Sequence, residues 1–487
     1  MAAPVCEYGR VNRVPTAAFI LISLGIPAFA QGPPVSPDRA WHSAEERAIA
    51  NQVSGIRQRA FQIDAGKTYS LAELIDLAEA HNPETRVAWE NARAQAASLG
   101  IARSELYPLL SAVALASIDR EEVPFGSEFF RQTVPGFEAS LDLSYTIFDF
   151  GARRGRVQAA SARVLAANFA FNNVHRNLIY RVQQTFYRLL NAQAQEEAAR
   201  ASLANAQTVE QSAEERLHDG LATLPDVLEA RSAAAQAQFD LQTVVGAEEI
   251  VRGDLATALG TSATISIRVE PLGDVPGPES VADNVNQAID RAFQQRPDLQ
   301  AEAASIRLAD AQRKEARAAY YPSLGFRASP SAQSLYLKQQ NLPWAHTADL
   351  TGSLAFSLNW TVFDGGARKN RVSEAEARIR QAEAQVHDAQ NEIADQVWAS
   401  YSNLNTAFRQ REAAKALLEA STESYNAALE SYNYGVRNLL DVTAAQKVLA
   451  QARSTDILAR TQVLVSLADL AFRAADSIQP AARKPQP

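Results

Sequence analysis

The chain has 487 residues, of which 47% are hydrophobic and 21% charged, a composition typical of folded rather than disordered proteins. Its formal net charge is -8, and it has no run of basic residues interleaved with aromatic ones. A nucleic-acid partner is therefore not expected, because phosphates require a basic face.

Residues 1–30 have the pattern of a secretory signal peptide. Two arginines precede the apolar run TAAFILISLGIPAF, and the sequence Ala-Phe-Ala follows it. The run is too short for a membrane-spanning helix, although a retained anchor is the alternative. Cleavage after Ala30 would remove Cys6, the single cysteine, so neither thiol chemistry nor a lipid anchor at the new N-terminus is expected. Residues 31–69 would then form an N-terminal periplasmic extension.

Two stretches alternate apolar and polar residues, as strands with one apolar face do. The first is PGFEASLDLSYTIF, from Pro135 to Phe148, and the second runs from Ser353 to Val362. Each is about ten residues long, the length with which a tilted strand crosses a membrane. Weaker strands are expected after Pro108 and Pro322. The alternative is a pair of amphipathic hairpins on a soluble core.

A very long helix is expected after each strand. Residues 151–220 and 366–435 contain no proline and are rich in Ala, Gln, Glu, Arg and Leu, all strong helix formers. A helix of this length extends for about 100 Å. Apolar residues recur at seven-residue steps, and alanines flank them, which predicts close coiled-coil packing. Such helices must pack against other long helices in a bundle or cylinder.

The order of strands and long helices occurs twice in the sequence, as an internal repeat. The stretches TIFDFGARRGRV and TVFDGGARKNRV, at residues 146–157 and 361–372, are identical at eight of twelve positions. Residues 70–275 and 276–476 are thus predicted to be two copies of one order: helix, strand pair, long helix, tip, helix. Residues 477–487 are proline-rich and expected to be disordered.

Counting strands predicts an assembly. Two copies supply four strands per chain, whereas a closed membrane barrel needs at least about eight. Open strand edges are not tolerated in lipid, so several chains must contribute to one barrel if the strands span a membrane.

Enzymatic chemistry is not expected. The six histidines are scattered, with no pair at i, i+4 and no cluster with the spacing of metal ligands. Neither a nucleophile-elbow motif nor a dinucleotide-binding glycine motif occurs. The sequence predicts no catalytic residue, no cofactor and no metal site.

One order of features occurs twice in the chain: a strand, the motif Phe-Asp-x-Gly-x-Arg, a long helix and a Gly-x5-Asp turn. In this order the chain resembles the TolC-like outer membrane efflux proteins, which belong to tripartite pumps and type I secretion systems. The resemblance implies an α+β membrane protein: a homotrimer with four strands per chain in a twelve-stranded β-barrel, continuous with an α-helical coiled-coil tunnel in the periplasm. It implies as partners outer-membrane lipid, a periplasmic adaptor and an inner-membrane pump, proton-driven or ABC. The alternative is a non-transporting periplasmic coiled-coil scaffold or adaptor.

The Gly-x5-Asp turns lie at the helix tips. Thr223 and Asp226 form a capping-box-like restart, and Asn438 is expected to cap the next helix, so each turn could be no more than a good helical turn. The resemblance implies a periplasmic mouth that opens like an iris. The implied adaptor contacts are Gly220, Leu221, Ala222, Thr223, Gly435, Val436, Arg437 and Asn438.

The resemblance also implies a gate. Tyr432 and Arg437 would reach toward the turn near Asp226, and Asp441 from three chains would form an acidic ring that favours cations. The family's best-known member has a second aspartate three residues later, where this chain has Ala444, so a double ring is not expected.

The repeated Phe-Asp motif is predicted to join barrel and tunnel. Its phenylalanine would lie at the membrane interface, its aspartate would cap the helix, and its glycine would allow the bend. The predicted junction residues are Tyr107, Pro108, Phe148, Asp149, Gly151, Tyr321, Pro322, Phe363, Asp364 and Gly366. Four following arginines would face lipid headgroups: Arg153, Arg156, Arg368 and Arg371.

Overall fold

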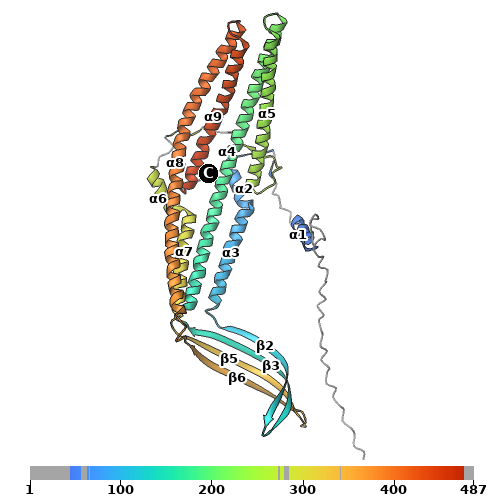
Figure 1. The fold of residues 1–487 in the computed structure, drawn as a ribbon, viewed down its shortest axis with the longest axis vertical. Helices are drawn as coiled ribbons and strands as arrows, with labels where there is room; N and C mark the ends of the chain where they lie inside the picture. Colours follow the sequence, from blue (N-terminus) through green and yellow to red (C-terminus); the bar gives the residue numbers. More distant parts are fainter. Residues whose placement is uncertain are drawn as a thin grey trace, which may run out of the picture. The chain divides into compact units, whose positions relative to one another are not determined.

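The protein is represented by a computed structural model that describes residues 44–55, 63–64, 66–271, 275–278, 284–340 and 342–476 (Figure 1). The expected signal peptide, most of the extension and the expected disordered tail lie outside these residues. The chain divides into two units, residues 1–59 and 60–487. In the first unit the described element is helix α1 (Ala44–Gly55), and all other elements below belong to the second.

Four antiparallel strands form one sheet in the order β2-β3-β5-β6. They are β2 (Leu109–Phe125), β3 (Glu128–Phe148), β5 (Ser323–Gln339) and β6 (Ala345–Asn359). As predicted, β2 and β5 begin directly after Pro108 and Pro322. The expected length of about ten residues was wrong, because the strands have 17, 21, 17 and 15 residues. The expected extension to Val362 was also wrong, since β6 ends at Asn359.

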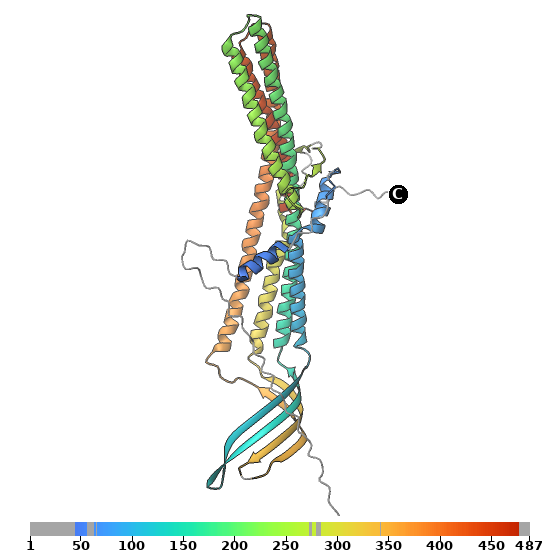
Figure 2. The ribbon, with the colours of Figure 1, turned by 90° about the vertical axis from the view of Figure 1, so that its right-hand side faces the viewer.

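Two helices of 67 residues each lead away from the sheet: α4 (Ala152–His218) and α8 (Ala367–Asn433). Both are therefore about 100 Å long, as predicted. Two shorter helices pack along each long helix, one beside each of its two ends (Figure 2). On the sheet side these are α3 (Pro83–Ser104) and α7 (Pro297–Ala318), and on the far side α5 (Leu224–Ala258) and α9 (Leu439–Arg473). We call the turns between α4 and α5 and between α8 and α9 the helix tips.

Small elements fill the middle of the bundle, where the shorter helices meet. Helix α2 (Leu71–His81) and the parallel pair β1 (Thr68–Tyr69) and β4 (Arg268–Val269) lie before residue 276, in what we call the first half of the chain. Helix α6 (Val285–Gln295) lies after residue 275, in the second half. The largest hydrophobic cluster lies here and combines α2, α4 and the end of α5. Its fully buried members include Leu74, Leu178, Val182, Leu189 and Leu255.

Corresponding helices of the two halves have equal lengths: 11 residues in α2 and α6, 22 in α3 and α7, 67 in α4 and α8, and 35 in α5 and α9. Close helix packing depends on small residues. A Cβ at Gly155 of α4 would lie 3.0 Å from the backbone nitrogen of Glu315 in α7, so a larger residue would require α7 to shift by a few tenths of an ångström. None of the described helices combines the length and hydrophobicity of a membrane-crossing helix.

Candidate functional site: the sheet-to-helix junction and the helix tips

The junction turns the chain from strand β3 into helix α4. Gly151 occupies the N-cap position with a left-handed φ of 98°, which L side chains rarely adopt. The carboxylate of Asp149 accepts hydrogen bonds from the backbone N–H groups of Gly151 at 3.2 Å and Arg153 at 2.9 Å. Asp149 was expected at the cap position itself; it satisfies the first-turn N–H groups from two residues upstream.

The second junction repeats this geometry between β6 and α8. Gly366 has a φ of 88°, and the carboxylate of Asp364 accepts from the backbone N–H of Arg368 at 2.9 Å and from its Nε at 2.8 Å. In both copies, burial opposes ionisation of the aspartate, yet the hydrogen bonds and the neighbouring guanidinium outweigh it. The pKa of Asp149 and that of Asp364 are therefore lowered from their ordinary value.

The arginines of the motif bind protein groups at the junction. Arg153 is 8% exposed and donates to Asp149 at 2.9 Å and to the carbonyl of Glu105 at 3.1 Å. Arg156 donates to the carboxylates of Glu105 at 2.6 Å and Glu315 at 3.3 Å. The expectation that these arginines face lipid headgroups was wrong for the buried Arg153, and Arg156 is held between two carboxylates.

Aromatic side chains surround the same level of the structure. Phe150 packs edge-on against Phe148, with ring centroids 4.6 Å apart, and stacks on Tyr321 at 4.7 Å, which joins the two halves. The predicted junction residues Tyr107 and Phe363 are 71% and 86% exposed. Large exposed aromatic groups at the end of a sheet are typical of a membrane interface.

The tips have the predicted caps. At the first tip Gly220 takes a φ of 72°, and the carboxylate of Asp226 accepts from the hydroxyl of Thr223 at 2.7 Å and from its N–H at 2.8 Å. Both bonds lower the pKa of Asp226, and the bond from the hydroxyl has the larger effect. At the second tip Asn438 accepts from the N–H of Asp441 at 3.0 Å.

The two tips touch through a residue that the sequence did not reveal. Arg216, near the end of α4, donates through Nη1 to the carbonyl oxygens of Tyr432 at 2.8 Å and Asn433 at 3.3 Å. Its guanidinium also lies 4.5 Å from the centroid of the Tyr432 ring. A basic residue in the last turn of a helix is a common signal, but nothing in the sequence shows that it binds the end of another helix.

Tyr432 is buried at this contact, with 5% exposure. It packs in a cluster with Val209, Val227, Leu439 and Val442. Burial raises the pKa of the Tyr432 hydroxyl, while Arg216 opposes and Asp226 adds to the increase. The structure thus packs Tyr432 in one cluster with Val227, the residue after Asp226, whereas the side chain of Arg437 is exposed at the turn.

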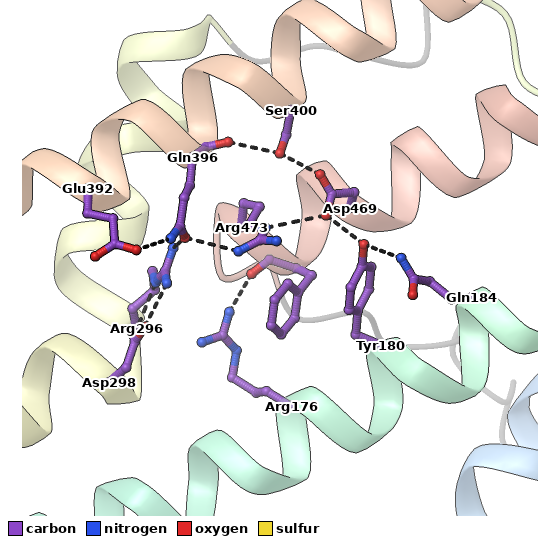
Figure 3. Close-up of polar contacts among 11 residues, drawn as sticks. Arg176, Tyr180, Gln184, Arg296, Asp298, Glu392, Gln396, Ser400, Asp469 and Arg473 are labelled. Atoms are coloured by element: carbon purple, nitrogen blue, oxygen red, sulfur yellow. Dashed lines mark hydrogen bonds and ion pairs between the residues drawn. The ribbon is translucent and has the colours of Figure 1, made fainter. Parts of the chain in front are cut away.

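A polar network in the middle of the bundle connects the two halves (Figure 3). Asp469 of α9 accepts from Tyr180 of α4 and Ser400 of α8, both at 2.6 Å, and from Arg473 at 3.3 Å. Gln396 of α8 extends the network, because its side-chain oxygen accepts from Arg473 at 3.1 Å and from Arg296 at 3.0 Å.

A second pair of contacts lies beside this network. Arg296 pairs with Asp298 at 2.6 Å, and Arg176 of α4 donates to the carbonyl oxygen of Phe472 in α9. Polar residues scattered along long helices gave no signal for these contacts, since they lie up to 296 positions apart.

Comparisons with known proteins agree with this architecture. The family model described as outer membrane efflux protein matches residues 74–261 and 288–474. Protein CyaE of Bordetella pertussis is 29% identical over 82% of this chain and 83% of its own, and outer membrane protein OprJ of Pseudomonas aeruginosa is 25% identical over 93% and 94%. The solved outer membrane protein VceC of Vibrio cholerae has the same fold, with a TM-score of 0.70 at 18% identity over 83% of this chain and 95% of its own.

These findings confirm the predicted resemblance, the location in the outer membrane and the role as a channel rather than an enzyme. The chain belongs to the outer membrane efflux protein family.

Proposed function

We propose that the chain is the outer-membrane channel of a tripartite export system and that it works as a homotrimer. The observation that carries this is the pair of unpaired sheet edges. Strands β2 and β6 are the two ends of the sheet, and each has a partner on one side among the described residues. Lipid does not tolerate open edges, so β6 of one chain pairs with β2 of the next until the sheet closes.

The number of chains follows from the width of the conduit. Two chains would give eight strands, and the interior of an eight-stranded barrel is largely filled by its own side chains. Three chains give the twelve strands that the resemblance implies. The first and last strands of the four-stranded antiparallel sheet, β2 and β6, run in opposite directions. Pairing β6 of one chain with β2 of the next therefore keeps the whole barrel antiparallel.

In this proposal the helices form a periplasmic tunnel. Exposed apolar side chains on their flanks support it, because a trimer would bury them between chains; they include Phe239, Ile250, Trp398 and Leu458, each more than half exposed. The two halves, residues 70–275 and 276–476, are then two copies of one unit, and each chain contributes both copies to the tunnel wall.

The tips form the mouth of the tunnel. Contact between Arg216 and Tyr432 supports a closed arrangement within each chain, with Arg437 directed to a neighbouring chain and Asp441 to the axis. At the tips, Leu221 is 69% exposed and Val436 79% exposed. Such apolar groups suit docking of the hairpin of a periplasmic adaptor, which would link the channel to an inner-membrane pump, proton-driven or ABC.

Fractionation and bilayer recordings test this proposal. We expect heat-modifiable trimers in the outer-membrane fraction and ion-conducting pores from the purified protein. Release by osmotic shock, without conductance, would instead support the alternative of a periplasmic scaffold.

A further inference from the structure

The strand register locates where the lipid-facing surface of the sheet ends. Residues directly opposite in neighbouring strands share a face, and the β2–β3 pairing is continuous from Leu109↔Ser144 to Phe125↔Glu128. The apolar face of β3 begins near Tyr145 and continues through Leu141 and Phe137. It reaches a polar row at Thr133, which pairs with Arg120 of β2 and Lys338 of β5.

The length of this face matches a membrane. Tyr145 and Thr133 are twelve positions apart, or about 40 Å along a strand, which becomes about 28 Å when the strand tilts by about 45°. The outward apolar band of an outer-membrane barrel is about 25 Å tall. Thr133 and its neighbours therefore lie at the outer end of the apolar band.

Positive charge accumulates at this end. Arg120 and Lys338 share the row of Thr133, and Arg131 lies one step further along the same face, where it faces Glu122 at 3.8 Å. All three cations are exposed, so this face carries three basic side chains against one carboxylate. Lys338 also lies 5.5 Å from the ring centroid of Trp344. We call Arg120, Arg131, Lys338 and Trp344 the outer rim.

The opposite end of the strands differs in charge balance. There Arg153 is paired with Asp149 at 2.9 Å, Arg368 with Asp364 at 2.8 Å, and Arg156 with two glutamates. These ion pairs compensate three of the arginines at that end, whereas Arg120 and Lys338 of the outer rim have no ion pair among the described residues.

We propose that the outer rim binds the phosphate groups of lipids in the outer leaflet. The inference rests on the proposed function, in which the sheet crosses the outer membrane and the helices lie in the periplasm. Cations at the end of an apolar band meet anionic headgroups directly, and arginine binds phosphate with paired N–H donors. Trp344 adds an amphipathic ring at the same level, where tryptophan favours the interface.

The test is a binding titration of the purified full-length protein with bisphosphorylated lipid A in uncharged detergent micelles, read by native mass spectrometry. One basic residue near a lipid surface is worth about fivefold in affinity, so Arg120→Gln combined with Lys338→Gln should weaken binding about 25-fold. Glu122→Gln should strengthen binding, by up to about fivefold, because it leaves Arg131 uncompensated.

Arg327→Gln is the matched control. Arg327 lies on β5 but pairs with Ser144, so it belongs to the polar face of the sheet. Its loss should leave lipid binding unchanged, and fully dephosphorylated lipid A should bind all variants equally. Equal affinity of the double variant and the wild type for the phosphorylated probe would overturn the proposal, as would an equal loss in Arg327→Gln.

The proposed function can fail separately. Absence of the wild-type protein from the outer-membrane fraction would refute the proposed channel function. Trimers that are correctly located but whose lipid affinity does not change with the charges of the outer rim would refute only the proposed lipid binding. Heat-modifiable mobility shows whether the double variant folds, and Glu122→Gln tests the same surface with the opposite sign.

Discussion

Replacing Arg216 by alanine should loosen the closed mouth. Arg216 makes two charge-assisted hydrogen bonds to the end of α8 and stacks on Tyr432. At a partly exposed site we assign about 1 kcal/mol to each bond and about 0.5 kcal/mol to the stacking. Its buried Nε finds no partner among the described residues, which offsets part of this sum. A net loss of about 2 kcal/mol per chain would favour opening about 30-fold.

Two measurements check this magnitude. Conductance in planar bilayers should rise, and spin labels at Leu221→Cys and Val436→Cys should report longer and broader distances between the tips of one chain. Both positions are exposed, and Cys6 is the only native cysteine and lies in the expected signal peptide.

Arg200→Ala is the matched control for this change. Arg200 is on the same helix, 68% exposed, and pairs one turn away with Glu196. Such an exposed pair contributes at most about 0.5 kcal/mol, so the control should behave as wild type. If Arg216→Ala also leaves both conductance and tip distances unchanged, the contact does not hold the mouth.

Three other changes have defined outcomes. Asp441→Asn should reduce cation preference in bilayer recordings, and unchanged selectivity would remove Asp441 from the proposed ring. The contribution of Asp149 to stability should be fully present above the ordinary aspartate pKa of about 3.9. It should be lost as the pH falls through the lowered pKa of the folded state, because protonation ends the bonds to Arg153. Asp149→Asn should therefore flatten this part of an acid-unfolding curve. Gly155→Ala should lower the melting temperature, since its Cβ would approach the α7 backbone to about 3.0 Å; a melting temperature equal to that of wild type would mean that α7 can move away.

Local chemistry made several elements predictable. The long helices follow from some seventy residues without proline, and the caps at Thr223 and Asn438 follow from side chains that satisfy N–H groups a few residues away. Each of these features depends on neighbours in the sequence. The left-handed glycines at the junction were predictable for the same reason, because the turn and its aspartate lie within one short motif.

Features that depend on distant residues were not predictable in this way. Strand β3 is about twice as long as expected, because its outer part pairs with β2 through residues that no longer alternate cleanly, from Thr133 to Glu128. Arg153 was expected in the headgroup region, but Asp149 and the carbonyl of Glu105 hold it in the protein. Arg216 could not be assigned because its partners lie more than two hundred positions away.

The contacts that hold α9 and α8 against α4 differ in strength along the bundle. In the middle, Asp469 has three donors from three helices, and burial together with the bond to Asp469 raises the pKa of the Tyr180 hydroxyl. The Asp469 side chain is 22% exposed, so removing one donor leaves a largely buried carboxylate with fewer hydrogen bonds, which is costly. At the tip, the partners of Arg216 in the described part of the chain are two backbone carbonyl oxygens and one ring. Separating a carboxylate from three donors costs more free energy than separating a guanidinium from two neutral carbonyl oxygens. We therefore expect the α8–α9 pair to move first at its tip and to pivot about the network around Asp469.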